Sequence, residues 1–353
     1  MSRAEILRHF TQQASWNKAL ASPLTAALLE KMADDFDSDG VLSALLSDWT
    51  GNPVRDALGL RLLGALHYAV LAKRDDALAD AFPNRDREDW DIDQIWPEAE
   101  RFLRSETDWV RSFIKHPPQT NETRRGFMFL TGMLNLAKQF RMPVDMLELG
   151  ASAGLNQYFD EFRYTTQNWK WGNPTSPVQV STEWQASLPP LATPLTVLQR
   201  KACDQNPLSL SDPETRLRLK SYIWPDQQER LSRFDAAADL AIERNIQVDK
   251  ADAVEWLASQ LKKRRPRVLT VVCHSVFFQY PPRETRRKLT QLIELAGEDA
   301  CPDSPLAWLR YEPEAIWTET DSAQMLLDFR VWPGNSHTRL ARSDGHVRLV
   351  TPA

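Results

Sequence analysis

Apolar and polar positions follow a helical pattern through the first third of the chain. Apolar residues recur every three or four positions in two stretches: Leu24, Leu28, Leu29 and Met32, then Leu58, Leu62, Leu66 and Ala69. This spacing puts each set on one face of an amphipathic helix. A third stripe carries Phe102, Trp109 and Phe113 and stops before Pro117, because proline cannot continue a helix. We therefore predict a helical N-terminal region or domain over 1–118, with these side chains in its core.

From residue 144 onward, short apolar runs alternate with helical stretches. The predicted strands are 144–149, 195–202, 246–248, 268–273 and 306–311, and the predicted helices after them are 155–164, 224–244, 254–263 and 283–296. Unbroken apolar runs are typical of strands that are buried on both faces of a parallel sheet. The fold class predicted for 119–353 is therefore α/β, a doubly wound Rossmann-like sheet that ends in an antiparallel hairpin over 325–331 and 339–349. The Trp- and Pro-rich stretch 165–194 is predicted to be an insertion.

The turn after the first predicted strand is the most informative stretch of the sequence. Gly150-Ala151-Ser152-Ala153-Gly154 follows the carboxylate of Glu148, in a chain that has only 12 glycines. Serine and leucine at 152 and 155 exclude the dinucleotide fingerprint Gly-x-Gly-x-x-Gly. The run matches the Gly-x-Ser-x-Gly nucleophile elbow of hydrolases, and it also fits the glycine loop of an S-adenosylmethionine site with serine as its middle residue. A tight turn without any ligand uses glycines as well.

The position of this turn favours the nucleotide-type site. A hydrolase elbow follows several strands and an oxyanion loop, whereas the sequence before residue 144 is helical. Doubly wound sheets bind nucleotides at the turn after their first strand.

Composition and charge restrict the partners. A formal net charge of −5 argues against nucleic acid as the main partner, and the one basic run, 262–265, is expected to end a helix. No apolar run is long enough to span a membrane, and the first residues do not resemble a signal peptide. Three cysteines without zinc spacing predict no metal site and fit a reduced, cytoplasmic setting. The oligomeric state does not follow from the sequence.

The order of helices, β/α units and terminal hairpin resembles that of S-adenosylmethionine-dependent methyltransferases. Along most of its length the chain also resembles the bacterial family called domain of unknown function 2332. The runs that carry this second resemblance are Pro118-Gln119-Thr120-Asn121-Glu122, Glu148-Leu149-Gly150-Ala151-Ser152-Ala153-Gly154-Leu155-Asn156, Trp224-Pro225-Asp226, and His274-Ser275 before Tyr280. The resemblance implies a methyltransferase-like fold and brings no established activity or substrate.

If the methyltransferase resemblance holds, acids at strand ends are expected to hold the cofactor, S-adenosylmethionine. Glu148 would anchor its ammonium group and Asp204 its ribose, unless Asp204 only caps the next turn. Asp252 is expected either to contact the adenine or to cap the following helix. The other residues expected at the cofactor are Gly150, Ala151, Ser152, Gly154, Asn156, Ala253, Ser275 and Asn121, of which Asn121 is equally suited to capping a helix.

Two residues after the 268–273 strand are catalytic candidates. His274 is the candidate general base, since histidine titrates near neutral pH, and a structural histidine at a strand end is the alternative. Tyr280 is the second, as catalyst or as pocket wall. The acceptor is expected to be a small molecule whose identity the sequence does not give. Two other functions remain open: a degenerate, non-catalytic cofactor-binding protein, and a serine hydrolase that uses Ser152 with an acid and one of three histidines, His274, His337 or His346.

Overall fold

The structure, a computed structural model, describes residues 2–119, 121–318, 322 and 324–353. Thr120, part of one run quoted above, lies outside the described residues. The chain forms two compact units, Met1–Thr120 with Ser211–Asp235, and Asn121–Leu210 with Ala236–Ala353.

The first unit is helical, as its periodicity predicts. Its helices are α1 (Arg3–Ala19), α2 (Pro23–Asp37), α3 (Val41–Leu45), α4 (Leu58–Leu71), α5 (Asp76–Ala81), α6 (Ile92–Ser105), α7 (Thr107–Phe113) and α9 (Pro213–Ser221). Leu24, Leu28, Leu62 and Leu66 are all buried in its core. The sequence did not predict α9, and it assigned the segment around α9 to the second domain.

A carboxylate from this later segment caps a helix near the N-terminus. The Asp226 carboxylate accepts the Ser22 hydroxyl at 2.5 Å and the Leu24 amide at 3.0 Å, at the start of α2. Such a cap satisfies amide groups that a helix leaves free at its N-terminus. Part of the Trp224-Pro225-Asp226 run thus has a structural role within the helical unit.

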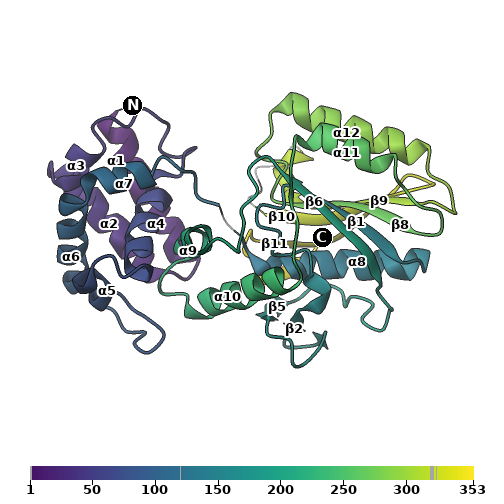
Figure 1. Cartoon of the computed structure of the whole chain (residues 1–353), viewed down its shortest axis with the longest axis horizontal. Coiled ribbons are helices and arrows are strands. Elements are labelled where there is room, and N and C mark those ends of the chain that lie inside the picture. Colours follow the sequence, from purple (N-terminus) through teal and green to yellow (C-terminus); the bar gives the residue numbers. More distant parts are fainter. Residues whose placement is uncertain (1, 120, 319–321, 323) are drawn as a thin grey trace. The chain divides into compact units, whose positions relative to one another are not determined.

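The second unit contains a nine-stranded mixed sheet, with strand order β5-β12-β11-β10-β9-β8-β1-β6-β7 (Figure 1). The strands are β1 (Val144–Leu149), β5 (Glu183–Trp184), β6 (Val197–Asp204), β7 (Asp249–Lys250), β8 (Leu269–Ser275), β9 (Leu306–Pro313), β10 (Met325–Trp332), β11 (Ser336–Ser343) and β12 (Leu349–Pro352). Strands β7, β6, β1, β8 and β9 are parallel, and β10 and β11 follow as an antiparallel hairpin. The predicted α/β class is therefore confirmed, and β12 is a further C-terminal strand.

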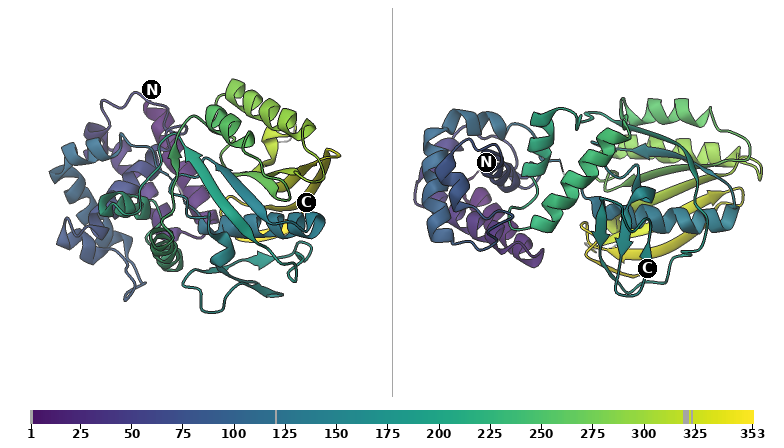
Figure 2. Two further views of the ribbon diagram at one scale, coloured as in Figure 1. Left: turned by 45° about the vertical axis from the view of Figure 1, so that its right-hand side comes forward. Right: turned by 60° about the horizontal axis from the view of Figure 1, so that its bottom comes forward.

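Helices cover both faces of this sheet. Helix α8 (Gly126–Phe140) lies on one face, and α11 (Ala253–Leu261) and α12 (Arg283–Glu298) lie on the other (Figures 1 and 2). Leu147 and Leu149 of β1 pack into the core that α11 and α12 cover. Every residue of β1 is buried, including its two acids Asp145 and Glu148, as is typical of a central strand covered on both faces. Helix α10 (Gln228–Glu243) contains the division between the two units.

The segment after β1 departs from the prediction. Residues 150–158 form turns followed by a short 3₁₀ helix at Phe159–Glu161, and the predicted helix over 155–164 is absent from these described residues. The cause lies in the backbone, because Gly150, Ser152 and Gly154 have φ values of 68°, 54° and 72°. Left-handed residues at alternate positions cannot continue into an α-helix.

The predicted insertion forms its own small sheet. Its strands are β2 (Arg163–Thr165), β3 (Lys170–Trp171) and β4 (Gln179–Ser181), and β5 joins the edge of the main sheet by pairing with β12. The remaining short elements are the 3₁₀ helices Thr123–Arg125 and Glu314–Ile316.

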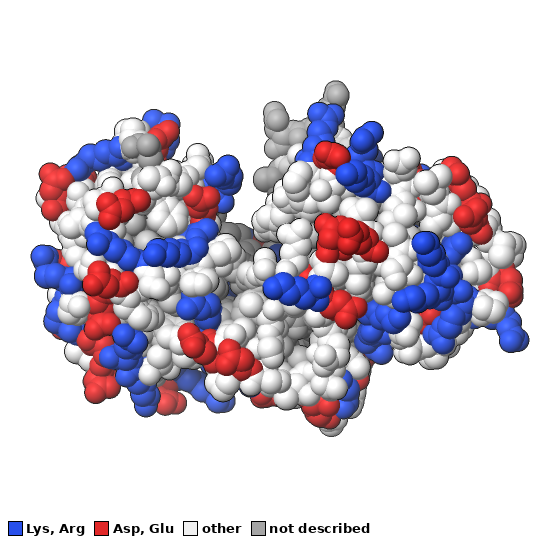
Figure 3. All heavy atoms as spheres, turned by 45° about the horizontal axis from the view of Figure 1, so that its top comes forward, with Lys and Arg blue, Asp and Glu red and all other residues white. Residues whose placement is uncertain are grey.

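Charged side chains of both signs share the visible surface of the helical unit (Figure 3). Within the described part of the chain, no helix has the length and apolar character that crossing a membrane requires.

Candidate functional site

The candidate site is the turn after β1, which hydrogen bonds hold against the end of β6. The Gly150 and Ala151 amides donate to the Cys203 carbonyl at 2.9 and 3.2 Å, and the Leu208 amide donates to the Ser152 carbonyl at 3.3 Å. In a parallel sheet the carboxyl ends of neighbouring strands share one edge. Open α/β sheets bind their ligands at this edge.

Asp204, at the end of β6, fixes two turns at once. Its Oδ2 accepts the Ser152 amide at 2.8 Å, and its Oδ1 accepts the Asn206 amide at 2.8 Å. The turn-capping role expected for Asp204 is therefore present, together with a contact to the β1 turn that the sequence did not reveal. Each carboxylate oxygen has a second acceptor site, so a ribose contact stays a prediction.

The glycines of the turn have a packing reason that is independent of any ligand. A Cβ atom at Gly150 would lie 2.2 Å from the Phe277 ring, and one at Gly154 would lie 2.6 Å from Ile246. Both glycines also have left-handed φ values, which favour residues without a side chain. The fold therefore requires glycine at both positions, whether or not a ligand binds there.

Glu148 is the residue whose environment calls for a ligand. Its side chain lies near the end of β1 and the residue is only 5% exposed. Its Oε2 atom is buried and has no hydrogen-bond partner among the residues that the structure describes. Burial, with a smaller effect from the charge of Asp204, raises the pKa of Glu148 to about 8. Buried polar atoms in native structures are nearly always paired. The carboxylate would be stabilised by a cation at this place.

The segment that precedes α8 in the chain lies beside this turn in space. The side-chain amide of Asn121 donates to the Ser152 hydroxyl at 3.2 Å, and the side-chain amide of Asn156 donates to the backbone carbonyl of Glu122 at 3.2 Å. Glu122 is buried and lies 3.4 Å from His346 Nδ1. Asn156 Oδ1, like Glu148 Oε2, is buried and has no hydrogen-bond partner among the described residues. The structure thus brings Asn121 and Asn156 together with Ser152 around one turn.

His274 occupies a fully buried, structural position. Its Nδ1 lies 2.5 Å from Glu312 Oε1, and its Nε2 accepts the Trp308 indole N–H at 2.9 Å. A ring that accepts at Nε2 donates its proton from Nδ1, so it is the neutral tautomer and both nitrogens are used. The alternative of a structural histidine therefore describes the geometry, and we do not assign His274 as a general base.

Glu312, at the end of β9, organises the loop that follows β8. Besides His274, its carboxylate accepts the Phe277 amide at 2.9 Å and the Phe278 amide at 3.1 Å. Phe277 is the side chain that packs on Gly150, so Glu312 sets one wall of the β1 turn. Sequence reasoning missed this role, although an acid at the end of the next parallel strand was an available signal.

The remaining predicted residues are placed as follows. Asp252 caps α11 by accepting the Val254 and Glu255 amides at 2.9 and 3.3 Å, which is the capping role expected for it. Ala253 is the first residue of α11, and Ser275 is the last residue of β8. The Tyr280 side chain is at the surface, since the residue is 75% exposed.

The hydrolase alternative lacks its structural context. A nucleophile elbow is a strand, a sharp turn and then a helix, and here turns follow Ser152. His274 is bonded at both nitrogens, and His337 lies 2.7 Å from Asp328 on the β10–β11 hairpin. Ser152 keeps the left-handed backbone of such elbows without their helix.

These features define a mixed α/β protein whose candidate site is a turn at the carboxyl edge of its parallel strands. The chain belongs to the family described as "Uncharacterized protein conserved in bacteria (DUF2332)", whose model matches residues 8–351. The family resemblance inferred from the sequence is thereby confirmed. Comparisons with curated proteins and with solved structures gave no match.

Proposed function

We propose that the edge formed by the β1 and β8 loops binds S-adenosylmethionine, and that the protein transfers its methyl group to a small-molecule acceptor. The observation that carries this proposal is Glu148. A buried carboxylate with an unpartnered oxygen, near the end of the first strand, suits the positively charged methionine part of this cofactor.

The strand order supports a nucleoside at this place. In chain order the parallel strands β7, β6, β1, β8 and β9 are arranged 3-2-1-4-5, the order of doubly wound nucleotide-binding sheets. The order reverses between β1 and β8, which is where such sheets bind their ligands. This arrangement favours the Rossmann-like assignment that the sequence suggested.

The turn after β1 favours a ligand without phosphates. Dinucleotides place their pyrophosphate on the N-terminus of the helix that follows the first strand. In the described residues, turns replace that helix. The charged side chain at the start of these turns is that of Glu148, an acid. S-adenosylmethionine carries no phosphate and has an ammonium and a sulfonium group. The turn therefore suits this cofactor better than a dinucleotide.

The residues of the turn would bind and orient the cofactor, which itself supplies the activated methyl group. Glu148 and the unpartnered Asn156 Oδ1 are acceptors for the ammonium group. Asp204, already fixed by the Ser152 and Asn206 amides, has acceptor sites left for ribose hydroxyls. Methyl transfer is mainly a matter of alignment, so this rigid turn would contribute by positioning.

Calorimetric titration of the full chain tests this proposal. We expect saturable binding of S-adenosylmethionine and of S-adenosylhomocysteine, since both carry the ammonium group. Glu148→Gln should weaken both by about tenfold or more, because it removes a bond between charged groups worth about 1.5–3 kcal/mol. Adenosine lacks the methionine part, so the same variant should leave its affinity unchanged.

Asp145→Asn is the matched control, because Asp145 is a buried carboxylate of the same strand that already pairs with Arg265. It should bind the cofactor like the parent chain. If folded protein binds neither cofactor form, the proposal is wrong. Binding without methyl transfer to any of a panel of small acceptors would identify the degenerate, non-catalytic alternative.

A further inference from the structure

We propose that the helical unit carries a second binding site, for a small molecule with a carboxylate or phosphate group. The site is a cavity of about 530 Å³ that extends from the end of α3 to the end of α7. Its lining residues are Leu45, Asp48, Trp49, Thr50, Gly51, Asp56, Arg61, Arg111, Ile114 and Lys115, all within the first unit. Small-molecule sites in proteins are about 300–1,000 Å³ in volume.

The first observation is a buried cation that forms no ion pair among the described residues. Arg61 is 8% exposed, and its guanidinium donates to three backbone carbonyls, those of Asp56 at 2.5 Å, Ile114 at 2.7 Å and Lys115 at 3.0 Å. These bonds use Nε and Nη1, and the N–H groups of Nη2 remain available to a ligand. Buried charges are normally paired with an opposite charge. Among the described residues Arg61 forms no ion pair, although the Asp56 carboxylate is near enough for its charge to act on the guanidinium. An anion at the Nη2 donors would be a direct partner for this cation.

A buried indole N–H without a partner is the second observation. Trp49 Nε1 is buried and has no hydrogen-bond partner in the described part of the chain. The Arg61 guanidinium carbon lies 5.4 Å from the centre of the Trp49 ring, so the two donors belong to one cluster. A Cβ at Gly51 would lie 3.2 Å from the indole nitrogen and 1.9 Å from Asp56 Oδ2. Glycine at position 51 therefore avoids a clash with both groups, and the Asp56 carboxylate shares the space near this N–H.

The charges of the lining indicate the class of ligand. Arg61, the Trp49 N–H and the exposed Lys115 are donors for an oxyanion. Asp48 and Asp56 line the same cavity, and their charges would repel a polyanion. A compact molecule with one carboxylate or phosphate group fits this combination.

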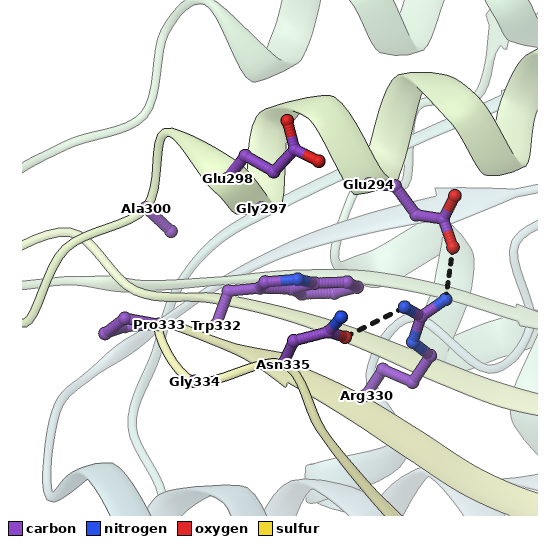
Figure 4. Close-up of a pocket in the computed structure, with 9 residues that line it drawn as sticks. All are labelled: Glu294, Gly297, Glu298, Ala300, Arg330, Trp332, Pro333, Gly334 and Asn335. Carbon is purple, nitrogen blue, oxygen red and sulfur yellow. Dashed lines mark hydrogen bonds and ion pairs between the residues drawn. The ribbon is translucent and has the colours of Figure 1, made fainter.

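A cavity of the α/β unit shows the contrast (Figure 4). It measures about 390 Å³ and lies between the end of α12 and the β10–β11 turn. Its arginine, Arg330, is paired with Glu294 at 2.5 Å and with Asn335 at 2.8 Å. There the arginine forms a direct ion pair, whereas Arg61 has only the longer-range charge of Asp56.

Thermal unfolding of the full chain with added acetate or inorganic phosphate tests the site, with chloride at equal ionic strength as the salt reference. We expect at least one oxyanion to stabilise the protein saturably beyond chloride. Trp49→Phe keeps an aromatic ring but removes the N–H together with part of the indole, so it should weaken this binding by about tenfold. Lys115→Ala, at an exposed position, should weaken it by a smaller factor.

Trp109→Phe is the matched control, because Arg74 lies 4.7 Å from the Trp109 ring centre and is already paired with Glu106 at 2.9 Å. This variant should bind the oxyanion like the parent chain. A response to acetate alone assigns a carboxylate, and a response to phosphate alone assigns a phosphate. No saturable effect of either ion, or unchanged binding by Trp49→Phe, would overturn the proposal. Neither outcome depends on the function proposed for the β1 turn.

Discussion

Two buried acids of β1 have opposite environments. Asp145 forms an ion pair with Arg265 near the start of the strand, and Glu148 has an unpartnered oxygen near its end. Both occupy a strand of otherwise apolar residues, so their residue types alone do not distinguish them. The difference lies in what the surrounding chain supplies. It makes Asp145 a structural residue and Glu148 the centre of the candidate site.

The titration of Glu148 predicts how stability depends on pH. Its pKa of about 8 in the folded state exceeds the ordinary 4.5, so folding favours the protonated carboxyl. The stability that protonated Glu148 contributes to the fold is therefore fully present below about pH 4.5 and is lost as the pH rises through about 8. The Glu148→Gln side chain cannot ionise. The difference in free energy of unfolding between this variant and the parent chain should therefore shift in favour of the variant by ~2 kcal/mol or more as the pH rises from about 5 to 8. Denaturant titrations across this range measure the difference, and parallel curves for the two proteins would contradict the prediction.

Glu312 should be among the most sensitive buried residues of the α/β unit. Glu312→Gln puts an NH₂ group where the carboxylate accepts two amides and His274, so a donor faces a donor. We expect a loss of ~2–4 kcal/mol in the free energy of unfolding, measured by urea denaturation. Glu294→Gln, which breaks the half-exposed pair with Arg330, should cost less than about 1 kcal/mol. Equal losses in the two variants would refute a special role for Glu312.

Among the elements, the β1 turn depends on close packing against the β8 loop. Gly150→Ala would place a methyl 2.2 Å from the Phe277 ring at a φ of 68°. We expect a loss of ~2–4 kcal/mol, from overpacking added to backbone strain. Gly334→Ala isolates the strain, because Gly334 has a φ of 101° and nothing within 4 Å of the added carbon. Its loss should be near ~1 kcal/mol. Combining Gly150→Ala with Phe277→Leu should recover part of the stability if packing is the cause.

The elements themselves were largely predictable, because their signals are local. The 268–273 run became β8 over Leu269–Ser275, and the 283–296 stripe became α12 over Arg283–Glu298. The helix expected after β1 failed because three left-handed residues interrupt it, and only Gly150 and Gly154 suggested such a backbone. Ser152 gave no such signal, since its φ of 54° is held by the contact of its amide with Asp204.

At the scale of the whole molecule, the helical unit is built from two separate parts of the chain. His67 Nδ1 lies 3.1 Å from the Ser221 carbonyl, and Asp226 caps α2. A fragment of residues 1–120 lacks both partners, so we expect it to show less helical ellipticity and a lower melting temperature than a mixture with the 211–235 peptide. Circular dichroism melts of the fragment with and without the peptide measure this. Identical melts would show that residues 1–120 fold without the later segment.

The sequence by itself determined most of the helices and strands, the α/β class, the family, and the turn after β1 as the place to look for a function. Those features depend on periodicity and on residues that are neighbours in the chain. Only the tertiary structure decided that both nitrogens of His274 are used and that, among the described residues, Glu148 Oε2 has no hydrogen-bond partner and the buried Arg61 has no ion pair. The physical reason is separation along the chain, since Ser152 and Asp204 are 52 residues apart and His274 and Glu312 are 38 apart. The state of a buried charge is set by such distant partners, which no local pattern encodes.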